Sequence, residues 1–179
     1  YCMPSFWIGL MLILVFAVHL QWLPSAGMVS FLAFDRPVWL DVGLHMILPA
    51  TCLFLATLPI YAKLSRASVL EVAREDFITT ARAIGFSERV VYMRHALRNA
   101  LLPTVTVAGY SLSALLTGAL LVETVFAWPG LGRVMFEAVS ARDYPVLMGG
   151  FLFATFLVII GNLIVDILYT YLDPRVVYA

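Results

Sequence analysis

Residues 68–103, SVLEVAREDFITTARAIGFSERVVYMRHALRNALLP, form the strongly charged block of an otherwise apolar chain. The interval 63–98 holds seven of the chain's 11 Lys and Arg residues. Each Lys or Arg at the centre of a bilayer costs roughly 2.5–3.5 kcal/mol on insertion scales. We therefore expect this block to lie in water, between membrane-spanning segments on either side.

The pattern within this block predicts two short helices with a sharp corner between them. Ser68 and Glu71 have the spacing of a capping box, and apolar residues then recur at helical intervals. Gly85 is predicted to follow the first helix in a left-handed conformation, and Ser87 to cap the second helix. Phe86, at the corner, either tucks under its own loop or docks into a partner protein.

The composition places the chain with integral membrane proteins. Its 179 residues are 63% hydrophobic, with a formal net charge of zero. Cys2 and Cys52 lie in or beside apolar segments, so we expect thiols rather than a disulfide. No Cys, His or carboxylate spacing indicates a metal site.

Apolar segments predict four membrane-spanning helices within a single transmembrane domain, 1–179. The predicted spans are 4–22, 42–62, 99–122 and 144–166, with the loop 63–98 joining the second to the third. The expected fold class is therefore all-α, a polytopic helical membrane protein. Pro49 and Pro59 should kink the second span or mark its ends. The excess of Lys and Arg in the central loop predicts that this loop faces the cytoplasm.

Small residues recur along the predicted third span. Gly109, Ser113 and Thr117 are spaced by four residues, with Gly118 beside them. Small residues at this spacing let helices approach closely in lipid. Helix packing and the lining of a translocation path are both open as their role, and the two faces need not be separate.

The segment ETVFAWPGLG, 123–132, predicts a turn after the third span. Pro129 and Gly130 suit a type II turn, with Gly130 at positive φ, and Gly132 follows. A short amphipathic helix at the surface is expected next. Asp143, just before Pro145, is typical of a helix start and should begin the last span.

The run TTARAIGFSERVVYMRHALRNALLP resembles the cytoplasmic EAA loop of ABC-importer permeases, in the dipeptide, oligopeptide and nickel branch. In that family a short helix of the loop sits in a cleft of the ATPase subunit. The resemblance implies that the ATPase-coupling residues are Thr79, Thr80, Ala81, Arg82, Ala83, Gly85, Phe86, Ser87 and Glu88. The Glu that gives the loop its name is absent, because Thr79 takes its position, a variant common in the peptide branch.

A second motif supports the same family. ETVFAWPGLG followed by ARDYP is similar to the signature of the first of the two permease types in peptide importers. The resemblance covers nearly the whole chain. It implies a type I ABC importer permease (MetI-like) core, and we expect the chain to be the C-terminal portion of a longer permease.

The resemblance implies a subunit that is not itself an enzyme and needs no cofactor. Its expected partners are a second permease subunit, ABC ATPase subunits, an extracytoplasmic substrate-binding protein and the lipid bilayer of a bacterial or archaeal cytoplasmic membrane, without nucleic acid. Dipeptides, oligopeptides, nickel and glutathione all remain open as cargo. The chain has no Walker sequence. An ion-coupled secondary transporter is the alternative, as is a membrane enzyme or anchor subunit, but few ionisable residues lie within the predicted spans.

Overall fold

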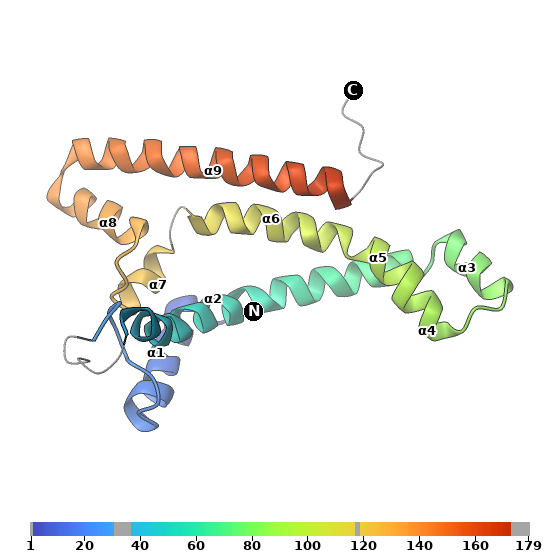
Figure 1. Cartoon of the computed structure of the whole chain (residues 1–179), viewed down its shortest axis with the longest axis horizontal. Coiled ribbons are helices and arrows are strands. Elements are labelled where there is room, and N and C mark those ends of the chain that lie inside the picture. The colour runs from blue at the N-terminus through green and yellow to red at the C-terminus, as the bar shows by residue number, and fades with distance from the viewer. Residues whose placement is uncertain (1, 31–36, 117–118, 173–179) are drawn as a thin grey trace. The chain divides into compact units, whose positions relative to one another are not determined.

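The structure of the chain is a computed structural model that describes residues 2–30, 37–116 and 119–172. Within these residues the chain is helical and contains no β-strand. Figure 1 shows the order of the elements. They are α1 (Ser5–Leu12), the π-helical η1 (Ile13–His19), α2 (Val38–Val72), α3 (Asp76–Ala83), α4 (Glu88–Val90), the π-helical η2 (Val91–Ala96), α5 (Leu97–Ala100), α6 (Leu102–Leu116), α7 (Leu120–Val125), α8 (Leu131–Ala141) and α9 (Tyr144–Leu172).

The chain divides into two compact units. The first comprises Tyr1–Leu58 and Ala114–Ile159, and the second comprises Pro59–Ser113 and Ile160–Ala179. The long helices α2 and α9 each contribute residues to both units.

The core of the first unit forms where α1 packs against α2 and α7. Its buried members are Leu12, Leu48, Cys52, Val122 and Phe126. Phe126 is 2% exposed, and burial of one such side chain stabilises a fold by about 1.5–3 kcal/mol. The short α7 is therefore anchored by its apolar side chains.

The second unit holds a small core of its own within the charged block. Ile78 and Ala81 of α3 are buried against Val91 and Ala96 of η2, with Val72 of α2 beside them. The water-exposed loop thus carries enough apolar surface to fix its two short helices against each other.

Two helices in the described part of the chain are long and apolar enough to cross a membrane, Val38–Val72 and Tyr144–Ile167. A shorter apolar helix runs over Ser5–His19. The limits 4–22, 42–62, 99–122 and 144–166 for four spans stay a prediction.

The capping box predicted at Ser68 and Glu71 is wrong. Ser68 is buried inside α2, which continues to Val72. The chain turns only after this point, and α3 begins at Asp76 with Glu75 at its N-cap. Extending an existing helix by one turn needs no new nucleus, so α2 runs through the local start signal.

The segment predicted as one third span is not one continuous helix. Ala119 has φ −113° and ψ 72°, so α7 is a separate helix from α6. α2, in contrast, is continuous through Pro49 and Pro59, and neither proline ends it. The predicted start of the last helix is confirmed, because the Val146 N–H donates to Oδ1 of Asp143 at 3.2 Å.

Candidate functional site

The charged block forms a corner, residues 83–88, between α3 and α4. Gly85 has φ +93°, a conformation that glycine adopts without a Cβ penalty. The Gly85 N–H donates to the Arg82 carbonyl at 2.9 Å, and the Phe86 N–H donates to the Ala81 carbonyl at 3.3 Å. These bonds form a Schellman motif, which closes the carbonyl end of α3. The conformation predicted for Gly85 is confirmed.

Arg82 bridges the corner from α3 to the following helices. Its Nε donates to Oε1 of Glu88 at 2.9 Å, and its Nη2 donates to the Tyr92 hydroxyl at 3.2 Å. The guanidinium carbon also lies 5.7 Å from the centroid of the Tyr92 ring. The hydrogen bond that Arg82 donates to Glu88 raises the pKa of Arg82. Water screens the exposed ion pair, so it orients the corner more than it stabilises it.

Large apolar side chains remain in water around this corner. Ile84 is 70% exposed, Phe86 is 47% exposed and Met93 is 64% exposed. The small core of the loop does not include them, and exposed apolar surface of this kind often marks a site of protein contact. The interpretation of Phe86 as a residue tucked under its own loop is not what its exposure favours.

Eight of the nine residues predicted to couple to an ATPase are exposed. They are Thr79, Thr80, Arg82, Ala83, Gly85, Phe86, Ser87 and Glu88. Ala81 is 6% exposed and packs in the loop core. Ser87 occupies the N-cap position of α4 as predicted, but its side chain makes no capping hydrogen bond.

The turn after α7 differs from the predicted type II turn. Gly130 is extended, with φ −119° and ψ 167°, at the N-cap of α8. The residue at positive φ is Ala127, with φ 47°. A Cβ on Gly130 would overlap the carboxyl carbon of Glu123. Gly130 is therefore required by the close approach of a side chain seven residues earlier, rather than by its own backbone conformation.

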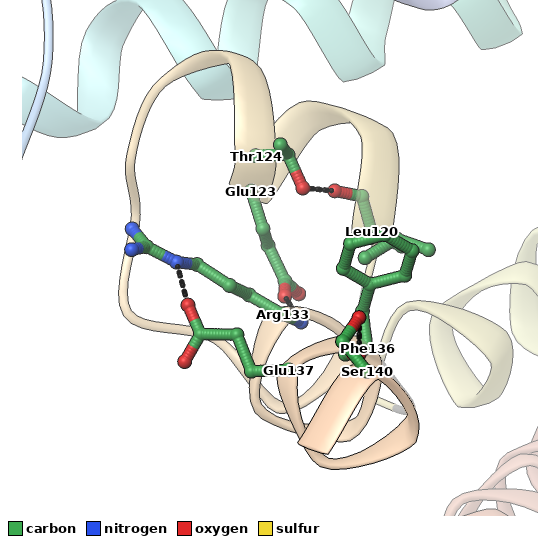
Figure 2. Close-up of polar contacts among 7 residues, drawn as sticks. All are labelled: Leu120, Glu123, Thr124, Arg133, Phe136, Glu137 and Ser140. Carbon is green, nitrogen blue, oxygen red and sulfur yellow. Dashed lines mark hydrogen bonds and ion pairs between the residues drawn. The ribbon is translucent and has the colours of Figure 1, made fainter. Parts of the chain in front are cut away.

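Glu123 was not predicted to have a role, yet its carboxylate is central to this region. The side chain is buried, at 9% exposure for the residue. Oε1 accepts the Ala119 N–H at 2.9 Å and Oε2 accepts the Arg133 N–H at 2.8 Å. Figure 2 shows the Glu123 side chain pointing from α7 to the start of α8. The signal in the sequence was a lone acidic residue eight positions before the start of α8, which is too weak to find it.

Within the second unit, Gly109 of α6 lies against α9. A Cβ on Gly109 would lie 2.5 Å from Cγ1 of Val165. This is a helix-packing contact, and the lining of a translocation path by these small residues stays a prediction. The predictions for Thr117 and Gly118 lie outside the described residues, as does the side chain of Ser113.

A polar cluster in which Asp41 and His45 are buried fastens the first loop to α2. The Ser30 N–H donates to Oδ2 of Asp41 at 2.6 Å, and the Ser30 hydroxyl donates to Oδ1 at 3.1 Å. His45 Nδ1 donates to the Asp41 carbonyl at 2.8 Å. Each group thus has a structural partner. Among the described residues no group of three or more His, Cys, Asp or Glu side chains could hold a metal ion.

Comparison with known proteins decides the family. The family described as "Binding-protein-dependent transport system inner membrane component" matches residues 1–178. The chain belongs to this family. It is a helical membrane protein, and the family description refers to inner-membrane components of transport systems that depend on a binding protein.

Two curated relatives are similar over 98% of the chain. The Dipeptide transport system permease protein DppB of Escherichia coli (strain K12) is 44% identical over 195 aligned positions, which cover 58% of that protein. The Di/tripeptide transport system permease protein DppB of Pseudomonas aeruginosa (strain UCBPP-PA14) is 43% identical over 192 positions, which cover 57% of it. The chain therefore spans just over half the length of these relatives.

Proposed function

We propose that this family member is part of the permease subunit of an ATP-driven importer for peptides. The proposal rests first on the similarity to a dipeptide and a di/tripeptide permease over 98% of the chain. The chain forms part of the translocation path and has no nucleotide site of its own. ATP is hydrolysed by separate ATPase subunits, and a second permease completes the path in a bacterial or archaeal cytoplasmic membrane.

The corner 83–88 is the proposed contact with the ATPase. The observation that carries this assignment is that the loop has a small core of its own yet displays apolar side chains. α3 and η2 share a closed core, while Ile84 and Phe86 are 70% and 47% exposed. A rigid loop can pass motion from a docked subunit to α2 and α6, because it does not absorb the displacement.

An ion-coupled secondary transporter is the competing function. Such transporters place ionisable side chains within their spans as ion or proton sites. His45 and Asp41 are buried near the start of α2, but His45 bonds to the Asp41 carbonyl and the Asp41 carboxylate accepts hydrogen bonds from Ser30. Glu123 is likewise bonded to two backbone N–H groups. These contacts favour structural roles, so the ATP-driven importer remains the proposal.

Uptake in proteoliposomes distinguishes the two functions. The full-length subunit is purified with the ATPase and binding protein that accompany it, and the uptake of radiolabelled dialanine is measured. We expect uptake that requires internal ATP and the external binding protein, and that persists when a protonophore removes the proton gradient. Uptake driven by an imposed ion gradient without ATP would overturn the proposal.

A further inference from the structure

The connector, residues 119–143, joins α6 to α9 through α7 and α8. Among the described residues of the connector, Glu123 is the acidic residue whose two carboxylate oxygens each accept a hydrogen bond from a backbone N–H (Figure 2). Oε1 bonds the Ala119 N–H at the N-cap of α7, and Oε2 bonds the Arg133 N–H in the first turn of α8. A single carboxylate thus holds the starts of two helices together, where helix N–H groups lack partners within their own helix.

The backbone around this carboxylate leaves no room for other side chains. A Cβ on Gly130 would overlap the carboxyl group of Glu123, and a Cβ on Gly132 would lie 3.1 Å from Oε2. The backbone N–H of Trp128 also donates to the Glu123 carbonyl at 2.8 Å. Glu123 therefore fixes both ends of the turn 126–130 through its side chain and its main chain.

The connector is fastened to a second loop of the same unit. The Gly27 N–H donates to the Phe126 carbonyl at 2.9 Å, and Phe126 is buried in the core with Val122. Under the proposed orientation both loops face the outside of the membrane. A partner arriving from outside would therefore meet a surface whose shape depends on the Glu123 carboxylate.

We propose that Glu123 is a positioning residue that holds the connector in the geometry required to receive the substrate-delivering binding protein. This inference rests on the proposed importer function. A surface held in its binding conformation loses less conformational entropy when a partner docks. Loss of the carboxylate should therefore weaken productive docking of the binding protein and leave the ATPase contact intact.

Glu123→Gln is the main variant, because the amide keeps the size of the side chain but offers only one oxygen. An amide NH₂ would then face a backbone N–H donor. Glu137→Gln is the matched control. It removes the same charge from an exposed carboxylate on α8, which pairs with Arg133 Nε at 2.8 Å and bonds neither helix start.

Two measurements are made on each full complex after its abundance in the membrane is checked. Hydrogen exchange of the peptide covering 119–133 reports whether the Glu123 carboxylate holds the starts of α7 and α8 together. We expect hydrogen exchange in Glu123→Gln to rise on the order of tenfold. The backbone amides of 119 and 133 lose their charged acceptor in this variant, and they should therefore open to solvent more often. The second measurement is ATPase stimulation by binding protein loaded with dialanine.

We expect the half-saturating concentration of binding protein to rise about tenfold in Glu123→Gln, with the maximal rate within about twofold of the wild type. Glu137→Gln should match the wild type in both measurements. Unchanged hydrogen exchange in Glu123→Gln would show that the Glu123 carboxylate does not hold the two helix starts together. Faster exchange with unchanged half-saturation would reduce Glu123 to a structural residue and overturn its positioning role.

A double-variant cycle gives a second, independent test of the inference. Gly130→Ala should speed exchange in the wild-type background, and its effect should shrink in a Glu123→Ala background, where the overlapping carboxyl group is gone. Additive effects of Gly130→Ala and Glu123→Ala on hydrogen exchange would contradict the contact between Gly130 and the Glu123 carboxyl group. If no binding protein stimulates the wild type, the proposed function fails together with the delivery role, whereas the exchange comparison still decides whether Glu123 orders the connector.

Discussion

Gly85, Gly109 and Gly130 are the glycines that the described structure needs most, and each is needed for a different reason. Gly85 has open space around it but a positive φ. Gly109 lies at a helix crossing, and Gly130 lies against a carboxylate. Gly85 could be predicted because its cause is local, at the end of a helix. The reason for Gly130 could not, because it depends on Glu123, which only the folded chain brings next to it.

The helix crossing at Gly109 gives a prediction at this scale. Gly109→Ala should lower the thermal stability of the purified protein in detergent, because the new methyl group meets Val165. Overpacking of this kind costs roughly 1–3 kcal/mol, of which the better helix propensity of Ala offsets up to about 1 kcal/mol. Val165→Ala in the same chain should restore part of the loss, as measured by the unfolding midpoint.

Gly149→Ala is the matched control for this prediction. Gly149 lies within α9 with no atom near its Cβ position, so the substitution should leave the midpoint unchanged or raise it. Equal midpoints for Gly109→Ala and Gly149→Ala would contradict the close crossing of α6 and α9.

At the scale of elements, α3 and η2 are held by a core that the sequence only partly revealed. The helical spacing of apolar residues predicted two short helices and their corner. It misplaced the start of the first helix, because the Ser68–Glu71 pattern is a weak local signal that a long existing helix overrides. The interruption between α6 and α7 was missed as well. Gly118 directly before Ala119 is the local signal of a break, but an isolated Gly inside an apolar segment is also compatible with a continuous helix.

The small core of the loop predicts a protease-sensitive variant. Ile78 is fully buried, and truncation of such a residue to Ala costs about 2–5 kcal/mol. Ile78→Ala should therefore loosen α3 from η2. Trypsin added to inside-out vesicles should then cut the loop 63–98 faster than in the wild type. Thr79→Ala, on the exposed face of the same helix, should be cut at the wild-type rate, and an equally slow cut in Ile78→Ala would rule out a stabilising core.

At the scale of the whole molecule, the sequence motifs predicted the family and the distribution of charge predicted the orientation, whereas single side-chain contacts were harder to predict. The family followed from two separate motifs, and the match over residues 1–178 confirms it. The orientation rests on the seven basic residues of 63–98, because Lys and Arg accumulate in cytoplasmic loops. Neither argument depends on how particular side chains pack.

Cysteine labelling tests the orientation. Ser87→Cys and Ser140→Cys place thiols at exposed positions in the corner and in α8. The background carries Cys2→Ser and Cys52→Ser, which remove the two native thiols. In intact cells an impermeant maleimide should label the thiol at position 140 and spare the one at position 87, which should react only after permeabilisation. Labelling of both in intact cells would place the two positions on the same side and refute the orientation.

The central claim is that the corner 83–88 docks onto an ATPase, and Phe86→Ala tests it most directly. Aromatic residues in partner pockets commonly contribute about 2 kcal/mol or more, which is roughly a thirtyfold change in Kd. Phe136→Ala is the matched control, since Phe136 on α8 is 53% exposed, compared with 47% for Phe86. The measurement is the Kd of the purified ATPase for each full-length variant reconstituted in nanodiscs. We expect Phe86→Ala to bind roughly thirtyfold more weakly and Phe136→Ala to bind as the wild type does; equal, wild-type affinity in both variants would contradict the coupling assignment.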